Sequence, residues 1–183
     1  ENHAVFGSIE YDFAARWTAG LELRWAEDEV TVTATPAPNA PPSTAVLCNR
    51  TLCNDTTTSL TPRFSLTWRT TDDLSTYANI AKGTKPGDFN SSVPDESYRV
   101  VDEETLWSYE LGRKSRLLDD RLSLALAAYY LEVDDQQLTS LVEVSTSPTA
   151  SPTASTTESI LVNAGTTATY GIEAELQAAL TDN

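Results

Sequence analysis

Two long alternating segments around a short polar turn, within residues 106–137, constrain the fold of this chain more than any other feature. Apolar and polar residues alternate from Trp107 onward, and after the turn at 116–120 every even position from Leu122 to Tyr130 is Leu, Ala or Tyr. This pattern predicts an antiparallel β-hairpin. Its arms are about ten residues long, roughly twice a usual strand and close to what a tilted strand needs to cross a bilayer. We therefore interpret the hairpin as part of a transmembrane β-barrel.

Composition narrows the classes of protein to which this hairpin can belong. The 183 residues carry a formal net charge of −15, which argues against nucleic acid as a partner because a nucleic-acid binder needs a basic surface. No run of eighteen apolar residues occurs, so the sequence predicts no membrane-spanning helix. Barrel strands are only half apolar and give a weak hydropathy signal. Composition therefore leaves both a transmembrane barrel and a soluble β-protein open.

Five further segments are expected to be strands, which gives about seven in all. Three of them, 3–13, 17–25 and 59–70, alternate well. The segment 74–82 alternates poorly, and the last strand is expected over 160–180. We expect an all-β fold, an antiparallel up-and-down meander in one curved sheet, with the first and the last strand at its open edges.

Tryptophans recur on the apolar side of these strands. Trp17 and Trp25 lie eight residues apart on one face, about 26 Å along a strand. With a tilt of about 40°, this span approaches the distance between the two aromatic girdles of a membrane barrel. Trp17, Trp25, Trp68 and Trp107 are therefore candidates for lipid-facing girdle positions.

Short turns alternate with long connections along the whole chain. The long connections are expected at about 34–58, 83–103 and 138–159, and the last is almost entirely Ser, Thr, Pro and Ala. In a meander every second connection lies at the same end, so one end of the sheet should carry all three. Short periplasmic turns opposite long extracellular loops are typical of outer-membrane barrels. A soluble β-sandwich can also combine alternating strands with unequal loops, so both interpretations stay open.

The two cysteines, Cys48 and Cys53, lie close together in the first long connection. If the protein is exported, a local disulfide is the expected state of such a pair. A zinc half-site is the alternative, but the chain contains one histidine and no second cysteine pair.

Four strings of residues resemble a known family: TPRFSLTW at 61–68, YANIAKGTKPGDFN at 77–90, YELGRKS at 109–115, and NAG at 163–165 followed by GIEAEL at 171–176. Their order and separations are similar to the C-terminal half of the barrel in TonB-dependent outer-membrane receptors. The resemblance covers nearly the whole chain, apart from the cysteine-bearing loop and the loop rich in Ser, Pro and Thr. Residues 1–183 are then expected to be a partial barrel, without a plug domain and without the C-terminal strand of the barrel.

The resemblance implies a barrel of about 22 strands in the bacterial outer membrane that imports a scarce ligand, such as a ferric siderophore, cobalamin or a glycan. Its partners would be outer-membrane lipid, the imported small ligand, and the TonB complex, which acts through the plug domain. Transport would belong to the intact protein. A passive porin is the alternative among barrels, because only the family strings argue for active import. No catalytic residue, metal site or cofactor is expected.

The resemblance also gives expectations for particular residues. A strand-to-loop turn is expected from Gly83, Lys85, Pro86, Gly87, Phe89 and Asn90. We expect positive φ at its glycines and an anchoring role for Phe89 at the barrel rim, with a structural role favoured over ligand contact. The residues expected to face the lumen, as a solvated polar wall, are Glu110, Lys114, Glu173 and Glu175. The stretch 163–165 is expected to allow a bulge or close strand packing near the rim.

An enzyme and a soluble secreted β-sandwich that binds a partner are the remaining alternatives. The only histidine, His3, lies at the start of the chain and argues against a histidine-based triad or metal site. The acidic pairs of the chain fall in turns or near strand ends, where solvated acids are expected. A sandwich would bury the apolar faces of its strands against a second sheet.

Overall fold

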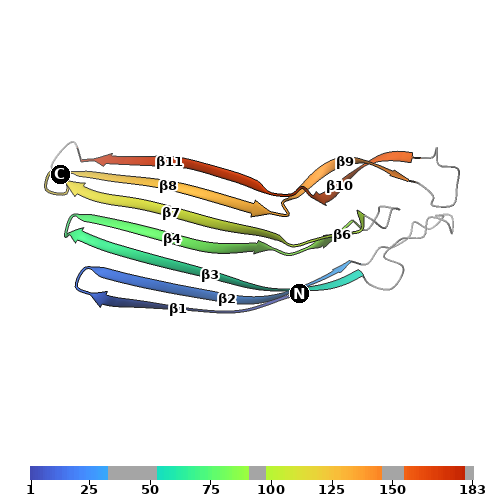
Figure 1. Cartoon of the computed structure of the whole chain (residues 1–183), viewed down its shortest axis with the longest axis horizontal. Helices are drawn as coiled ribbons and strands as arrows, with labels where there is room; N and C mark the ends of the chain where they lie inside the picture. The colour runs from blue at the N-terminus through green and yellow to red at the C-terminus, as the bar shows by residue number, and fades with distance from the viewer. Residues whose placement is uncertain (33–52, 91–97, 146–154, 180–183) are drawn as a thin grey trace.

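A single antiparallel sheet of seven long strands makes up most of the structure (Figure 1). The computed structural model describes residues 1–32, 53–90, 98–145 and 155–179. The long strands are β1 (Asn2–Ala14), β2 (Trp17–Val32), β3 (Cys53–Thr71), β4 (Leu74–Lys85), β7 (Glu104–Leu117), β8 (Leu122–Asp134) and β11 (Thr167–Ala178). They pair in the order β1-β2-β3-β4-β7-β8-β11, so β1 and β11 are the open edges. The predicted meander is therefore confirmed.

Alternation along the strands gives the sheet one apolar and one polar face. The register aligns Leu21, Phe64, Ile80, Tyr109 and Tyr130 in one row across neighbouring strands. These side chains are not covered by a second layer, since Phe64 is 50% exposed and Ile80 is 42% exposed. A β-sandwich would bury such a row against a second sheet. The described strands therefore argue against the sandwich alternative.

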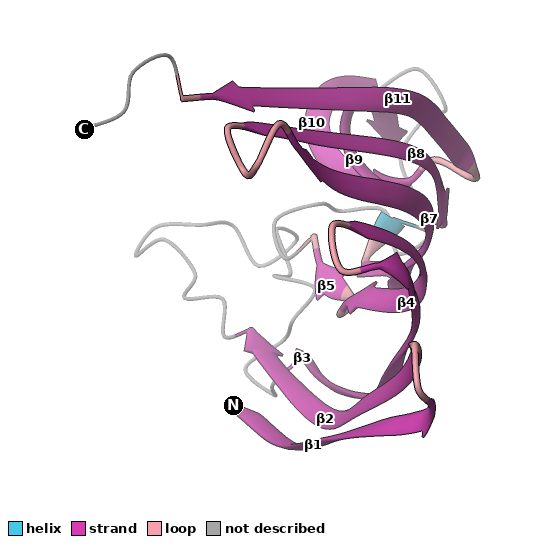
Figure 2. Ribbon diagram, turned by 90° about the vertical axis from the view of Figure 1, so that its left-hand side faces the viewer, coloured by secondary structure: helices cyan, strands magenta, loops and turns pink. Residues whose placement is uncertain are grey.

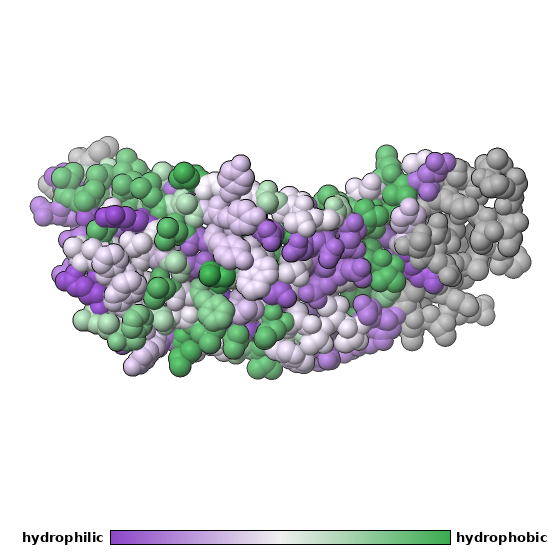
Figure 3. All heavy atoms as spheres, viewed as in Figure 1, coloured by the Kyte–Doolittle hydropathy of each residue, from purple (hydrophilic) through white to green (hydrophobic). Residues whose placement is uncertain are grey.

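The sheet is one layer thick and bends into an open arc (Figure 2). On the face that Figure 1 turns to the viewer, hydrophobic residues gather over the half nearer the short turns, and hydrophilic residues gather toward the long connections (Figure 3). No described residue belongs to a helix long and apolar enough to span a membrane. The arc is not closed, because each of its edge strands, β1 and β11, pairs on one side only.

All three short turns lie at one end of the sheet, and the long connections lie at the other (Figure 1). The turn after β7 is the longest of the three, four residues against two, and has positive φ at Leu118, Asp119 and Asp120. Backbone hydrogen bonds link each turn to the next strand, for example from Arg116 N to Asp73 O at 2.8 Å. The short-turn end is therefore a compact rim.

Strands β2 and β3 run further than the sequence predicts. The sequence predicts strands over 17–25 and 59–70 with a connection at about 34–58, yet the pairing continues to Val32 and Cys53. Where both faces of a pair of strands are in contact with water, neither face has to be apolar. Charged side chains therefore do not interrupt the backbone pairing. Cys48 lies outside the described residues, and so does the predicted Cys48–Cys53 disulfide.

The third long connection contains a hairpin that the sequence analysis did not predict. Strand β9 (Gln137–Ser145) pairs with β10 (Ser155–Asn163), and a break at 164–166 separates β10 from β11. The predicted single strand over 160–180 is therefore wrong, and 138–159 is not wholly irregular. The hairpin forms because Ile160 is buried, with Tyr98, Val142 and Val162 packed against it. A small second hairpin, β5 (Asp88–Phe89) with β6 (Val100–Val101), lies within the predicted 83–103 connection.

Candidate functional site

The polar face carries a charged cluster across β4, β7 and β11. Lys114 on β7 shares a row with Glu175 on β11, and Tyr77 on β4 shares the next row with Glu173. On β8, which lies between them, both rows carry alanine. These short side chains leave an open hollow of roughly 550 Å³, lined by Tyr77, Lys114, Glu173, Glu175 and the two alanines. The structure thus gathers three of the four residues predicted to face the lumen.

Tyr77 links the fourth of these residues, Glu110, to the same cluster. The Tyr77 ring fills the space beside Gly112, and Lys114 Nζ lies 5.5 Å from the ring centroid, in cation–π range. Glu110 lies two residues before Gly112 on β7 and therefore on the same face as Tyr77. Among the described residues, no ion pair involves Lys114. One ammonium group, two carboxylates and an aromatic ring therefore line an open hollow that can hold a polar ligand.

The four tryptophans lie on the opposite, apolar face. Trp17 stacks on Trp68 with ring centroids 5.4 Å apart, next to the short turns. Trp25 and Trp107 lie toward the long connections, and Trp107 stacks on Tyr109 at 6.4 Å. The tryptophans thus lie at two levels of the apolar face, one near the short turns and one near the long connections, and the row of Phe64, Tyr109 and Tyr130 lies between them.

Asn90 ties the second long connection to the third. Its Nδ2 donates to Tyr98 O and to Leu161 O, both at 2.7 Å, and its Oδ1 accepts from Leu161 N at 3.0 Å. Leu161 lies on β10, whose other edge pairs with β9. The Asn90 amide therefore takes the place of a strand beside the free edge of β10.

Two further amides join the same connections. Gln137, which is 7% exposed, donates from Nε2 to Pro86 O at 2.9 Å and to Asp102 O at 3.0 Å. Asn163 donates to Asp102 O at 3.0 Å, and its Oδ1 accepts from Asp102 N at 2.8 Å. We call Asn90, Gln137 and Asn163 the amide clamp. Each of these bonds joins an amide side chain to a backbone group. A substitution of the amide residue would therefore remove the bond, whereas a substitution of its partner residue would not.

The predicted strand-to-loop turn contributes Asn90 to the amide clamp, and its Pro86 carbonyl accepts from Gln137. Its glycines do not have the conformation that the sequence predicts. Neither Gly83 nor Gly87 has positive φ, since the only described glycine that does is Gly165, at 84°. Gly83 lies within β4, paired with Leu106. Gly87 is buried, and a Cβ there would lie 2.5 Å from Val101 O. Gly87 is therefore needed for close backbone approach, and the prediction of positive φ at these glycines is wrong.

The other members of the predicted turn have unequal roles. Lys85 ends β4 and is exposed, and Pro86 supplies its carbonyl to the amide clamp. Phe89 is half-buried in β5, where it pairs with Val100. Gly165, with positive φ, lies in the break between β10 and β11, and nothing lies within 4 Å of a Cβ placed there, so the close strand packing predicted for 163–165 is not seen at this glycine.

Gln137 and Tyr77 are the residues that sequence reasoning missed. Gln137 meets partners 51 and 35 positions away, and Tyr77 acts through its register with Gly112 on another strand. A glutamine at a strand start and a tyrosine on a polar face give no local signal of such partners. Within the described ranges, no group of three or more metal-ligating side chains gathers.

Comparisons with known proteins agree with this architecture. The family model for TonB dependent receptor-like, beta-barrel proteins matches residues 1–182. The metal-pseudopaline receptor CntO of Pseudomonas aeruginosa is 28% identical over 123 residues, which are 67% of this chain and 16% of that receptor. The copper transporter OprC superposes with a TM-score of 0.73 at 17% identity, over 98% of this chain and 26% of that one. The ferric yersiniabactin uptake receptor FyuA of Yersinia pestis superposes with a TM-score of 0.68 at 20% identity, over 98% of this chain and 24% of that one.

A one-layer arc of long antiparallel strands, apolar on one face and polar on the other, is the wall of a transmembrane β-barrel. This chain belongs to the TonB-dependent receptor β-barrel family, whose members are outer-membrane proteins. The relatives are receptors and transporters rather than enzymes. The chain spans 16% of the length of the curated relative.

Proposed function

We propose that this chain forms part of the wall of an outer-membrane transporter that actively imports a scarce nutrient with energy from the TonB complex. Membership of the family supports the proposal, and the apolar face with aromatic residues at both of its ends carries it. The relatives are named for metal-pseudopaline and ferric yersiniabactin. A metal held by a small organic chelator is therefore the cargo we favour over cobalamin or a glycan.

In this proposal the apolar face contacts outer-membrane lipid. Trp17 and Trp68 form one girdle, and Trp25 and Trp107 form the other. The eight residues from Trp17 to Trp25 cover about 26 Å along the strand, or about 20 Å along the membrane normal at a tilt near 40°. This distance approaches the height of the apolar band of a barrel. The short turns then lie in the periplasm, and the long connections lie outside the cell.

The polar face lines the lumen in the same arrangement. The charged cluster around Tyr77 and Lys114 faces the passage or the plug domain of the intact protein, where it stays hydrated. The amide clamp lies at the extracellular end and holds two long connections in a fixed relative position. A rigid rim favours ligand capture, because less conformational freedom is lost when the ligand binds.

The test uses the intact protein in its own outer membrane. Cells are supplied with radiolabelled iron, nickel or zinc chelates, and accumulation is compared between cells with and without the gene, each with and without TonB. We expect accumulation that needs both the gene and TonB. We also expect the protein to fractionate with the outer membrane and to migrate faster on gels when unheated, as stable barrels do.

Two results would contradict the proposal. Accumulation that needs the gene but is unchanged without TonB would identify a passive porin. Recovery of the intact protein in the soluble fraction, with no heat-dependent change in migration, would indicate a soluble binding domain.

A further inference from the structure

Arg113 is out of place on the apolar face of the sheet. The register puts it in one row with Trp17, Trp68, Thr76 and Leu126. Between this row and the row that contains Trp107, no other described residue of the apolar face is charged. Each neighbour of Arg113 across the strands, Thr76 and Leu126, is uncharged. A guanidinium group thus lies between a threonine and a leucine on the apolar face.

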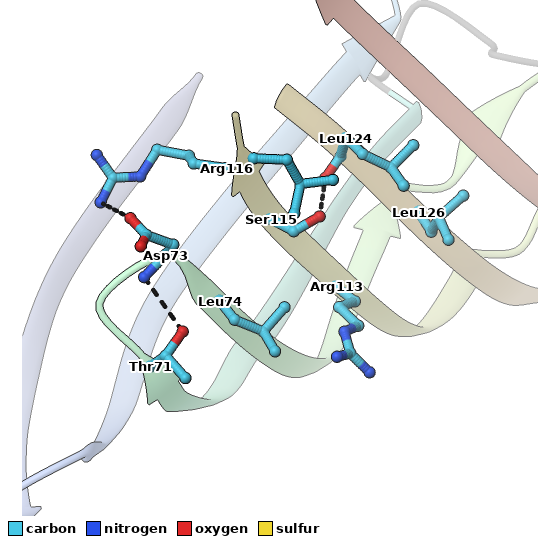
Figure 4. A pocket seen from close by; sticks show the side chains of 9 residues that line it. Thr71, Asp73, Leu74, Arg113, Ser115, Arg116, Leu124 and Leu126 are labelled. Atoms are coloured by element: carbon cyan, nitrogen blue, oxygen red, sulfur yellow. Dashed lines mark hydrogen bonds and ion pairs between the residues drawn. The ribbon is translucent and has the colours of Figure 1, made fainter. Parts of the chain in front are cut away.

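Beside Arg113 lies an open hollow of roughly 470 Å³ between β4, β7 and β8 (Figure 4). Its apolar lining comes from Leu74 on β4, Leu117 on β7, and Leu124 and Leu126 on β8. Ser115 adds a hydroxyl, which donates to Leu124 O at 3.4 Å. The hollow therefore combines a leucine surface with a cation at its border.

A second arginine at the hollow, Arg116, differs from Arg113 in having acidic partners. Arg116 lies 3.2 Å from Asp73 and 3.3 Å from Asp120, and it also donates to Asp72 O. Its charge is satisfied by the acidic turns, as Figure 4 shows for Asp73. No ion pair among the described residues includes Arg113. A charge on a lipid-facing wall is unfavourable unless it reaches polar groups.

We propose that this hollow binds one phospholipid of the periplasmic leaflet, with the phosphate on Arg113 and an acyl chain along Leu74, Leu124 and Leu126. The inference rests on the proposed function, because it needs the apolar face in lipid and the short turns in the periplasm. The guanidinium fork matches two phosphate oxygens, and charge-assisted bidentate hydrogen bonds of this kind are stronger than neutral ones. Arg113 lies in the girdle row of Trp17 and Trp68, from which a long side chain reaches the headgroups.

The experiment uses the intact barrel, purified in mild detergent and shown to be folded by its heat-dependent migration. Dioleoyl phosphatidylglycerol is titrated, and bound lipid is counted by native mass spectrometry. We expect one tight site, weakened about tenfold in R113Q because a charge-assisted bidentate contact is lost. R113K should retain part of the affinity, because an ammonium group keeps the charge without the fork.

Two controls test whether binding needs the phosphate as well as the acyl chains, and whether it takes place at this hollow rather than elsewhere on the apolar face. Dioleoylglycerol, which has the same chains without phosphate, should bind weakly and equally to wild type and R113Q. K82Q, which removes a cation from the same face at the opposite girdle, should leave the tight site unchanged. L126W keeps Arg113 but fills the hollow, so it should also weaken binding and provides a second test if R113Q does not fold.

Equal phosphatidylglycerol binding by wild type, R113Q and L126W would overturn the assignment. Occupation of the site by lipopolysaccharide or by a second copy of the chain would also overturn it. Failure of the proposed transport function would appear differently, as a soluble protein or as accumulation independent of TonB. A membrane-inserted, TonB-dependent transporter without a phospholipid at Arg113 would therefore refute this inference alone.

Discussion

The ring of Tyr77 on β4 occupies the space that a side chain at Gly112 on β7 would need, because a Cβ built at Gly112 overlaps the ring. Gly171 on β11 has the same relationship to Tyr129 on β8, whose hydroxyl would lie 2.6 Å from a Cβ at Gly171. The polar face is thus packed by tyrosines that lie over the glycines of neighbouring strands. Such pairing restores the packing that a glycine leaves out of a sheet.

The first prediction concerns this pair. G112A should displace Tyr77 and lower the stability of the intact barrel by about 1–3 kcal/mol, the usual range for overpacking. The double variant Y77S/G112A should recover part of the loss, because the smaller serine leaves room for the new methyl group. G7A is the control, since nothing lies within 4 Å of a Cβ at Gly7. Urea unfolding in detergent measures all three, and equal stability of G112A and G7A would contradict the packing relationship.

The second prediction concerns the amide clamp. N90D cannot donate to Tyr98 O or Leu161 O, and its carboxylate faces two carbonyl oxygens. We expect a local loss of about 1–3 kcal/mol and faster amide hydrogen exchange in peptides that cover 155–163. N54D, which alters an amide exposed at the surface and bonded to Glu29 at 3.0 Å, should leave exchange in these peptides unchanged. Unchanged exchange in N90D would show that the clamp does not hold β10.

The third prediction separates the two glycines of the strand-to-loop turn. G87A brings a methyl group to within 2.5 Å of Val101 O, so the β5–β6 hairpin must shift and should lose about 1–3 kcal/mol of local stability. In G83A the nearest atom, Leu106 Cβ, would be 3.8 Å away, which is ordinary contact. Limited proteolysis of the intact barrel should therefore cut the 86–103 connection faster in G87A than in G83A or wild type. Similar rates in both variants would argue against the close approach at Gly87.

The fourth prediction concerns the two faces of β11. Glu173 and Ile172 are neighbours that lie on opposite faces of the sheet, and both are exposed in this chain. In the intact barrel in membranes, E173C should react with a small charged thiol reagent through the lumen, while lipid should protect I172C. Mass spectrometry measures the labelled fraction at each position. Equal labelling of both cysteines would contradict the assignment of the faces.

Sequence reasoning recovered the meander and the two faces because both follow from period-two alternation, which is local. It placed the four tryptophans on one face for the same reason. It did not predict the β9–β10 hairpin, because the buried Ile160 depends on Tyr98, which is distant in sequence. Its error at Gly83 and Gly87 has a similar origin. The need for glycine at 87 comes from the backbone of Val101, which no local pattern encodes.

The spacing of the short turns fixes how the wall must continue. The last paired residues before the three short turns are Ala14–Trp17, Thr71–Leu74 and Leu117–Leu122. Their distance from the row that contains Trp17, Thr76 and Leu126 increases from β2 to β4 and from β4 to β8. This distance increases by about one residue per strand. With a strand spacing near 4.8 Å, the strands are tilted by roughly 35° from the barrel axis if all the turns lie at the same height. Any strand that pairs with β1 or β11 has to continue this register shift. The short turns therefore set the pitch of the complete cylinder, although they form only its lower rim.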